Sequence, residues 1–254
     1  MGRAFRQQRA KPAAKSAPVR PLDMTKLKPG TCNRIALNID MEPEFLWCPP
    51  GSFLMGSPET EEKRNVDEVQ HLVTLTRGFW IGKTEVTRAQ WKAVMGDAGF
   101  AWTSLWGGDA ELPIDTVSWH QCREFCKRAG NGFRLPTEAE WEYACRAGTV
   151  TPFSFGMSLN GTSANCAGGA DPYGTLVSGP NSFGSKRVES YERNPWGLYD
   201  MHGNLFEWCA DYYAEYPDGD QTDPKGPTSG TVHPTWYPGH PFRQFRGGSF
   251  GKDA

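Results

Sequence analysis

The sequence lacks any long apolar run, and it lacks an excess of charge of one sign. No stretch approaches the ~18 consecutive apolar residues that indicate a membrane-spanning helix, so no transmembrane segment is expected. The 27 Lys and Arg residues nearly balance the 29 Asp and Glu residues, which leaves a net charge of −2. A domain without a basic surplus is not expected to bind nucleic acid.

Cysteine motifs are also missing, although the chain contains seven cysteines. No C-x-x-C pair and no cluster of Cys and His has the spacing of a zinc site. An odd number of cysteines cannot all pair within one chain, so reduced and mostly buried thiols are expected. Cys122 and Cys126 are one helical turn apart on a predicted helix and should face the same side.

Glycine, proline and aromatic residues are abundant instead. The chain has 29 Gly, 20 Pro and 10 Trp, and aromatic residues make up 13% of it. This composition predicts many turns, short elements and a core built around large rings. It argues against a helical bundle and against a regular array of βαβ units.

Residues 1–30 differ in composition from the rest of the chain. They contain eight Lys and Arg residues, four prolines and a single acidic residue, Asp23. We interpret residues 1–30 as a disordered basic tail or linker. No apolar segment follows the basic residues, so no secretory signal is evident. The cytoplasm is therefore the default location, and export stays an open alternative.

Alternating and continuous apolar patterns predict short strands early in the chain. We expect strands at 45–48 and 52–56, paired as a hairpin around the Pro-Pro-Gly at 49–51. Further strands are expected at 71–75 and 79–82.

Helix-start signals follow these strands. Thr87, Ser118 and Thr137 each precede a helical pattern, and Thr137 with Glu140 has the form of a capping box. After Gly148 we expect mostly turns and short strands. This order of elements predicts an α+β domain.

Several segments resemble the sulfatase-modifying factor family, which includes the formylglycine-generating enzymes. The segments are 50–56 (PGSFLMG), 84–87 (TEVT), 113–119 (PIDTVSW), 134–143 (RLPTEAEWEY), 194–208 (NPWGLYDMHGNLFEW) and 246–250 (RGGSF). They follow the order found in the family. The resemblance implies a domain at 35–254 with the family's variant C-type-lectin-like fold, which is loop-rich and poor in regular secondary structure. It also implies that most motif residues, such as the tryptophans, belong to the core.

The motif that includes Arg134, Glu140 and Glu142 has two interpretations. A partly buried charge network that orders the centre of the domain is one. A catalytic acid/base pair is the other.

The resemblance implies two calcium sites, built from the hard oxygen ligands that Ca²⁺ prefers. The first uses the side chains of Asp200 and Glu207 and the carbonyls of Gly203 and Leu205. An alternative for this segment is an Asx-turn in which Glu207 caps nearby amides. The second site uses the side chains of Asn165 and Asp171 and the carbonyls of Cys166 and Tyr173. Calcium at this second site would hold long loops and contribute stability.

The resemblance also raises the question of copper. Formylglycine-generating enzymes oxidise a substrate cysteine with O₂ and bind copper(I) between two cysteines that closely follow a G-G-S segment. In this sequence Lys252 occupies the position of the first such cysteine, and the second would fall beyond Ala254. A copper cofactor is therefore expected only for an active, longer form. Ser249 is assigned to a candidate substrate pocket, and no catalytic residue is identified.

Two functions follow as hypotheses. The first is oxidation of a cysteine in a protein substrate to formylglycine. The second is a non-catalytic, calcium-braced binding module that presents loops such as 216–242 to a protein or peptide ligand. Family domains continue past the G-G-S segment and close with a G-F-R strand, so we expect the domain to be incomplete at its C-terminal end. The sequence does not determine the oligomeric state.

Overall fold

A computed structural model describes residues 23–37, 41–61, 64, 67–96, 109–159, 161–166, 184–230 and 241–250 of the chain. Within these residues the elements are, in chain order, η1 (Met24–Lys26, a 3-10 helix), β1 (Cys32–Arg34), β2 (Glu44–Cys48), β3 (Gly51–Met55), β4 (His71–Leu75), β5 (Phe79–Gly82), α1 (Arg88–Met95), α2 (Trp119–Ala129), α3 (Glu138–Arg146), β6 (Glu207–Tyr212), β7 (Gln221–Thr222) and β8 (Arg243–Arg246).

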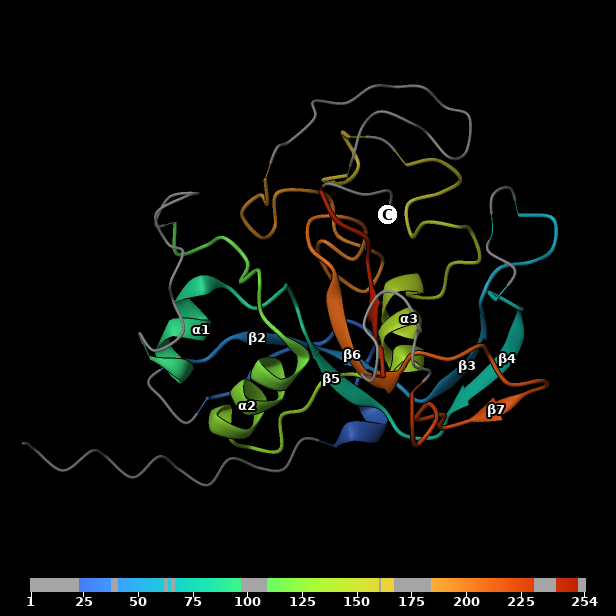
Figure 1. The fold of residues 1–254 in the computed structure, drawn as a ribbon, viewed down its shortest axis with the longest axis horizontal. Helices are drawn as coiled ribbons and strands as arrows, with labels where there is room; N and C mark the ends of the chain where they lie inside the picture. The colour runs from blue at the N-terminus through green and yellow to red at the C-terminus, as the bar shows by residue number, and fades with distance from the viewer. Residues whose placement is uncertain are drawn as a thin grey trace, which may run out of the picture.

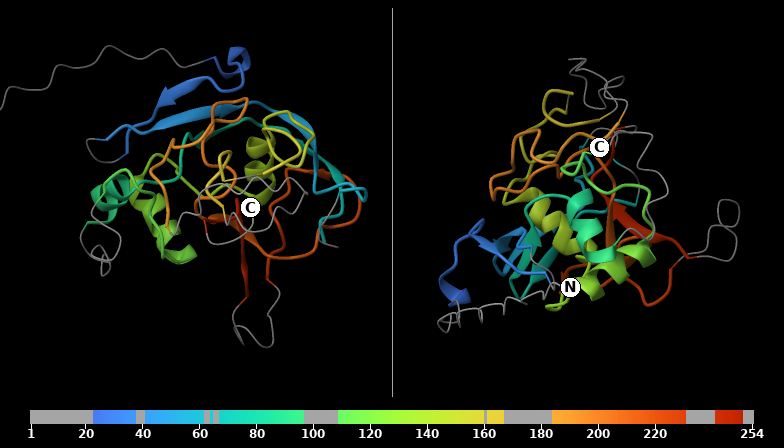
Figure 2. Two further views of the ribbon diagram at one scale, coloured as in Figure 1. Left: turned by 90° about the horizontal axis from the view of Figure 1, so that it is seen from above. Right: turned by 90° about the vertical axis from the view of Figure 1, so that its left-hand side faces the viewer.

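Small sheets and short helices are arranged around a central helix. The sheets have the strand orders β1-β2-β5, β3-β4-β7 and β6-β8. Helices α1 and α2 lie on one side of the molecule and the β3-β4-β7 sheet lies on the other, with α3 and β6 between them (Figures 1 and 2). This arrangement confirms the α+β class predicted from the sequence.

The predicted helix starts are confirmed. Thr87, Ser118 and Thr137 are the N-caps of α1, α2 and α3, and each accepts a hydrogen bond from the main-chain N–H three residues later. In all three helices the side chain of that third residue bonds back to the N-cap main chain, which completes a capping box. Three reciprocal caps fix where these short helices begin.

The predicted hairpin between 45–48 and 52–56 is wrong. Both strands exist, but β2 pairs with β1 and β5, whereas β3 pairs with β4. The prolines at 49 and 50 lack main-chain N–H groups, and at this point the chain passes from one sheet to the other. Adjacency in sequence therefore gave the wrong partner for β3.

Two apolar clusters form most of the core. The larger one surrounds α3, where Trp141, Ala144 and Cys145 pack with residues of β2, β3, β4 and β6. The smaller one joins α1 and α2 through stacked rings of Trp91 and Phe125, whose centroids are 5.2 Å apart. The expected packing of the motif tryptophans holds for Trp91, Trp119 and Trp141, whereas Trp196 and Trp208 are half-buried.

The N-terminal segment joins the domain earlier than expected. Residues 1–22 lie outside the described part of the chain, so the predicted tail stays a prediction there. Asp23 caps η1, and the Gly30 N–H donates to the carbonyl of Trp47 at 2.9 Å. In the described residues no helix is long and apolar enough to cross a membrane.

Candidate functional site

The turn at 200–207, which carries the first predicted calcium site, is held against α3 by Asn194. The Asn194 amide nitrogen donates to the carbonyls of Ala144 and Cys145 at 2.8 and 3.1 Å. Its side-chain oxygen accepts from the N–H groups of Trp196 and Leu198, both at 3.0 Å. One buried amide therefore fixes the chain that leads into the turn.

The turn itself has left-handed backbone at Asp200, Gly203 and Asn204, with φ of 56°, 83° and 61°. A Cβ at Gly203 would lie 2.3 Å from the carbonyl oxygen of Asn165, so this position requires glycine. The Asn204 N–H donates to the same Asn165 oxygen at 2.7 Å. The Gly203 N–H donates to the Gly247 carbonyl at 2.5 Å. Residues from both predicted calcium sites therefore lie side by side.

Asn204 links the turn to Glu85, a residue for which the sequence gave no role. The Asn204 side chain is buried, its oxygen accepts from Asn165 Nδ2 at 2.9 Å, and its nitrogen donates to Glu85 at 2.6 Å. The second Glu85 oxygen accepts from the Leu205 N–H at 3.0 Å. An acidic residue two positions before the N-cap threonine Thr87 was the available sequence signal.

Three carboxylates share this buried region, and no ion pair to any of them is found among the described residues. Burial raises the pKa of Asp200 to about 6 and the pKa of Glu207 to about 7. Burial, and then the nearby charges of Glu207 and Asp200, raise the pKa of Glu85. Clustered acids without a countercharge favour either protonation or a bound cation.

The donor chemistry fits calcium, but the side chains do not converge on one point in this arrangement. The described residues contain no group of three or more His, Cys, Asp or Glu placed to hold a metal. Asp200 lines a small cavity with His202, while Glu207 lines a different and larger one. Of the second predicted site, Asp171 and Tyr173 lie outside the described residues. Calcium would need both carboxylates, deprotonated, to turn toward each other.

Ser249, assigned to the candidate substrate pocket, lies beside the 200–207 turn. The next N–H, of Phe250, donates to the Asn204 carbonyl at 2.9 Å. Lys252, which stands where the family has a copper cysteine, is outside the described residues. All seven cysteines are described, and none of them forms a disulfide.

A buried thiol and an imidazole lie near the turn. Cys145 Sγ is 3.6 Å from His202 Nε2, which also accepts from the Ser154 N–H at 3.1 Å. Burial raises the pKa of Cys145 to about 12 and lowers the pKa of His202 to about 4. Both groups are therefore neutral near pH 7, and this pair is not a thiolate nucleophile.

An aromatic ridge stands at the surface on β6, β8 and the residue that precedes β6. We use this name for Phe206, Trp208 and Phe245. The Phe206 and Phe245 rings are 4.7 Å apart and lie 43% and 47% exposed, and Trp208 contacts Phe245 edge-on. Large exposed rings grouped in this way are typical of interaction sites.

The charged residues of the 134–143 motif form two separate sets. Arg134 and Glu140 make a double ion pair at 2.6 Å near the surface. Glu142 is buried and instead accepts from Arg146, Arg246 and the Gly56 N–H. The expected single network is thus wrong, because residues two positions apart within one helical turn, such as Glu140 and Glu142, point to different faces of α3.

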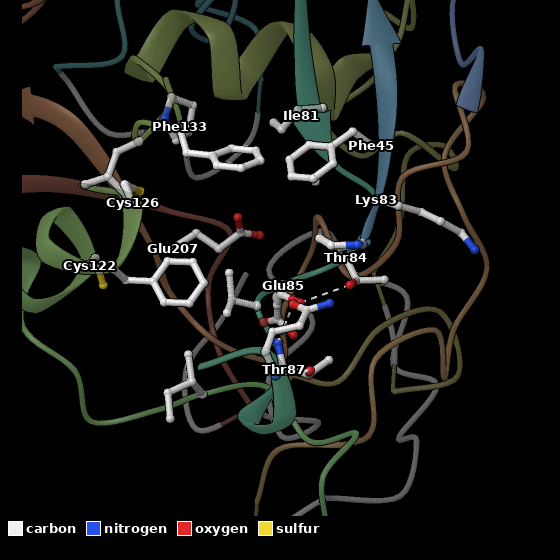
Figure 3. A pocket seen from close by; sticks show the side chains of 18 of the residues that line it. Phe45, Ile81, Lys83, Thr84, Glu85, Thr87, Cys122, Cys126, Phe133 and Glu207 are labelled. Atoms are coloured by element: carbon white, nitrogen blue, oxygen red, sulfur yellow. Dashed lines mark hydrogen bonds between the residues drawn. The ribbon is translucent and has the colours of Figure 1, made fainter. Parts of the chain in front are cut away.

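One cavity next to this region was not foreseen from the sequence. A cavity of about 590 Å³ lies between β5, α1, α2 and the start of β6. The rings of Phe45 and Phe133 and the side chain of Ile81 face this space, and the Glu207 carboxylate points into it (Figure 3). Cys122 and Cys126 both line it, which confirms that they share one helix face.

Comparison with known proteins finds similar sequences among the formylglycine-generating enzymes and their relatives. The mouse formylglycine-generating enzyme is 36% identical over 144 residues, which cover 52% of this chain and 38% of that enzyme. The cattle protein named inactive C-alpha-formylglycine-generating enzyme 2 is 32% identical over 164 residues, covering 64% of this chain and 50% of that protein. The formylglycine-generating enzymes of mouse, cattle and Streptomyces coelicolor are matched over only 32–43% of their own length.

Solved structures agree on the fold. PvdO from Pseudomonas aeruginosa superposes with a TM-score of 0.68 and 27% identity, covering 89% of this chain and 88% of PvdO. Treponema denticola variable protein 1 has a TM-score of 0.66 at 24% identity, covering 88% of this chain and 89% of that protein. These likenesses confirm the predicted variant of the C-type-lectin-like fold. The family model described as sulfatase-modifying factor enzyme 1-like domain matches residues 35–254, and the chain therefore belongs to this family.

Proposed function

We propose that this chain is a polypeptide-binding member of the sulfatase-modifying factor family, braced by calcium. The observation that carries the proposal is the exposed aromatic ridge on β6 and β8. In the sequence, Lys252 stands where the family has a copper-binding cysteine. A lysine ammonium cannot serve as a soft thiolate ligand for copper(I). Binding of a protein segment at the ridge needs no such ligand.

Calcium is proposed at Asp200 and Glu207, with the carbonyls of Gly203 and Leu205. Its support is the set of buried carboxylates without a positive partner among the described residues. The second calcium site, at Asn165, Cys166, Asp171 and Tyr173, is proposed only from the resemblance. Calcium would neutralise the carboxylates and fix the turn that carries Phe206.

A calcium titration followed by thermal unfolding tests the brace. At a hundredfold excess over Kd, binding should add about 2.7 kcal/mol to the free energy of unfolding, a rise in Tm of about 5–10 °C. Asp200→Asn and Glu207→Gln should abolish the rise. Asp211→Asn, a control at another buried carboxylate, should retain it. Equal rises with calcium in all four proteins would refute this site.

Formylglycine formation is the second candidate function, favoured by the names of the relatives. The purified protein would be incubated with a C-x-P-x-R peptide, copper(I) and O₂. Mass spectrometry would then report whether the cysteine CH₂–SH becomes an aldehyde. We expect peptide binding that weakens in Phe245→Ser and no aldehyde. Turnover would replace the binding proposal with the oxidase.

A further inference from the structure

Strand β5 has an unpaired edge within the described part of the chain. It is the last strand in the order β1-β2-β5. Trp47 of β2 lies opposite Trp80 and uses its own main-chain groups to bond to the segment that leads into β1. By antiparallel alternation, the main-chain groups of Trp80 and Gly82 then point away from β2. No main-chain partner for them is found among the described residues.

The cavity of about 590 Å³ runs along this same edge. All four residues of β5 line it, and all four are half-buried. The opposite wall is apolar and comes from α2 and from the loop before α3, with Phe125 and Phe133 as its largest side chains. An unpaired strand edge beside an apolar hollow has the form of a groove for one more strand.

One end of the groove is acidic. Glu44 and Glu189 at the rim are both paired to Lys83, at 3.0 and 2.9 Å. Glu85 and Glu207 also line the cavity, and no ion pair to either is found in the described residues. An occupant with a positive group at this end would complement them.

We propose that the groove receives an extended polypeptide segment that adds to the β1-β2-β5 sheet at the edge of β5. Its main chain bonds to Trp80 and Gly82, and its alternate apolar side chains fill the space between Ile81 and Phe133. A Lys or Arg of the segment lies near Glu85, and near Glu207 when no calcium is bound there. A span of four residues, about 13 Å of strand, matches the length of β5. The groove adjoins the aromatic ridge, because Phe206 and Trp208 also line the cavity. The proposal concerns the main-chain edge of β5, whereas the proposed function concerns the exposed surface at Phe245, so the two can be tested separately.

The competing occupant is a small apolar molecule, because cavities of about 300–1,000 Å³ commonly bind such ligands. The two occupants differ in whether they bond to the main chain of β5. A peptide strand protects the amides of Trp80 and Gly82 from hydrogen exchange, whereas an apolar molecule fills the cavity without bonding to them.

The test begins with selection from a displayed library of random twelve-residue peptides, in EDTA so that no ion occupies Glu207. The enriched peptide is then synthesised with and without N-methylation of alternate amides, in both registers. We expect alternating apolar residues with a Lys or Arg. We also expect at least tenfold slower exchange at Trp80 and Gly82, and at least tenfold weaker binding for one N-methylated form.

A protein variant gives an independent check. Cys122→Phe fills the cavity from α2 and should weaken peptide binding at least tenfold, while Cys32→Phe, at an exposed cysteine on β1, should not. The N-methyl comparison uses the unaltered protein, so it stands even if Cys122→Phe does not fold. The proposal fails if no peptide is enriched, if N-methylation in either register has no effect, or if Trp80 and Gly82 stay unprotected. If peptide binding were lost in Phe245→Ser but kept in Cys122→Phe, the result would bear on the aromatic ridge and not on the groove.

Discussion

Glu142 lies at the centre of the molecule with three donors around it. Burial alone would raise its pKa, but Arg246 and Arg146 reverse this effect and hold the pKa below its usual value. Arg246 also bonds to Glu138 at 3.2 Å and lies against the Trp141 ring. The carboxylate therefore holds a half-buried arginine in place between α3 and β8.

Replacing Glu142 by Gln should destabilise the domain strongly. The change removes the buried carboxylate of the Glu142–Arg246 ion pair and leaves the half-buried Arg246 without its main countercharge, at a cost of the order of 3 kcal/mol. Urea unfolding followed by circular dichroism would measure it. Glu124→Gln is the matched control, since Glu124 pairs with Arg128 on the exposed face of α2 and should matter little. Similar losses in both variants would contradict this account.

His202 should make stability depend on pH. Burial, with help from Arg146 and Arg246, lowers its pKa to about 4, against about 6.5 in the unfolded chain. Between about pH 6.5 and pH 4, the His202 imidazole is protonated mainly in the unfolded state. The free energy of unfolding therefore falls as the pH drops through this range. The loss should be of the order of 1–3 kcal/mol.

The measurement is the free energy of unfolding from pH 4 to 8 in the natural protein and in His202→Asn. The difference between the two proteins isolates His202 from the carboxylates that titrate in the same range. A difference that is constant across this range would rule out a lowered histidine pKa.

At the scale of elements, the capping boxes determine where the short helices start. Thr137→Ala removes the acceptor for the Glu140 N–H at 3.2 Å and should cost about 1 kcal/mol. Chemical denaturation would measure the cost, with Thr228→Ala at an exposed loop position as the control. A change within error at Thr137 would mean that packing of α3 alone fixes its start.

These caps were predictable because capping is local, decided within four residues. Strand pairing was not, because partners such as β3 and β4 are chosen by the fold as a whole. For the candidate site, the sequence placed Asp200, Gly203 and Asn204 in one turn. It could not show that Glu85 reaches this turn across 119 positions of chain, or that Glu207 faces a cavity.

For the molecule as a whole, the thiols should differ widely in reactivity. Cys32 is exposed, Cys122 and Cys126 are half-buried, and the remaining four are buried. Burial raises the pKa of Cys122 to about 12 and that of Cys126 to about 11. With a chromogenic disulfide reagent at pH 8, one thiol should react at once, two slowly, and four only after unfolding.

Peptide mapping of the modified protein would identify the first thiol to react, expected to be Cys32. Rapid modification of Cys145 instead would mean that the region around His202 opens readily. Fewer than seven thiols after unfolding in denaturant would reveal a disulfide.

The packing of α3 against strands from both ends of the chain has a consequence for synthesis on the ribosome. The cluster joins Leu46 and Met55 to Leu198 and Cys209, so its last strands emerge long after its first. At about 5–20 residues per second, residue 246 follows residue 55 by roughly 10–40 s. During that interval the apolar faces of β2 and β3, and of α3 once it has been synthesised, lack their C-terminal packing partners. The nascent chain is thus a natural client for chaperones that shield such surfaces.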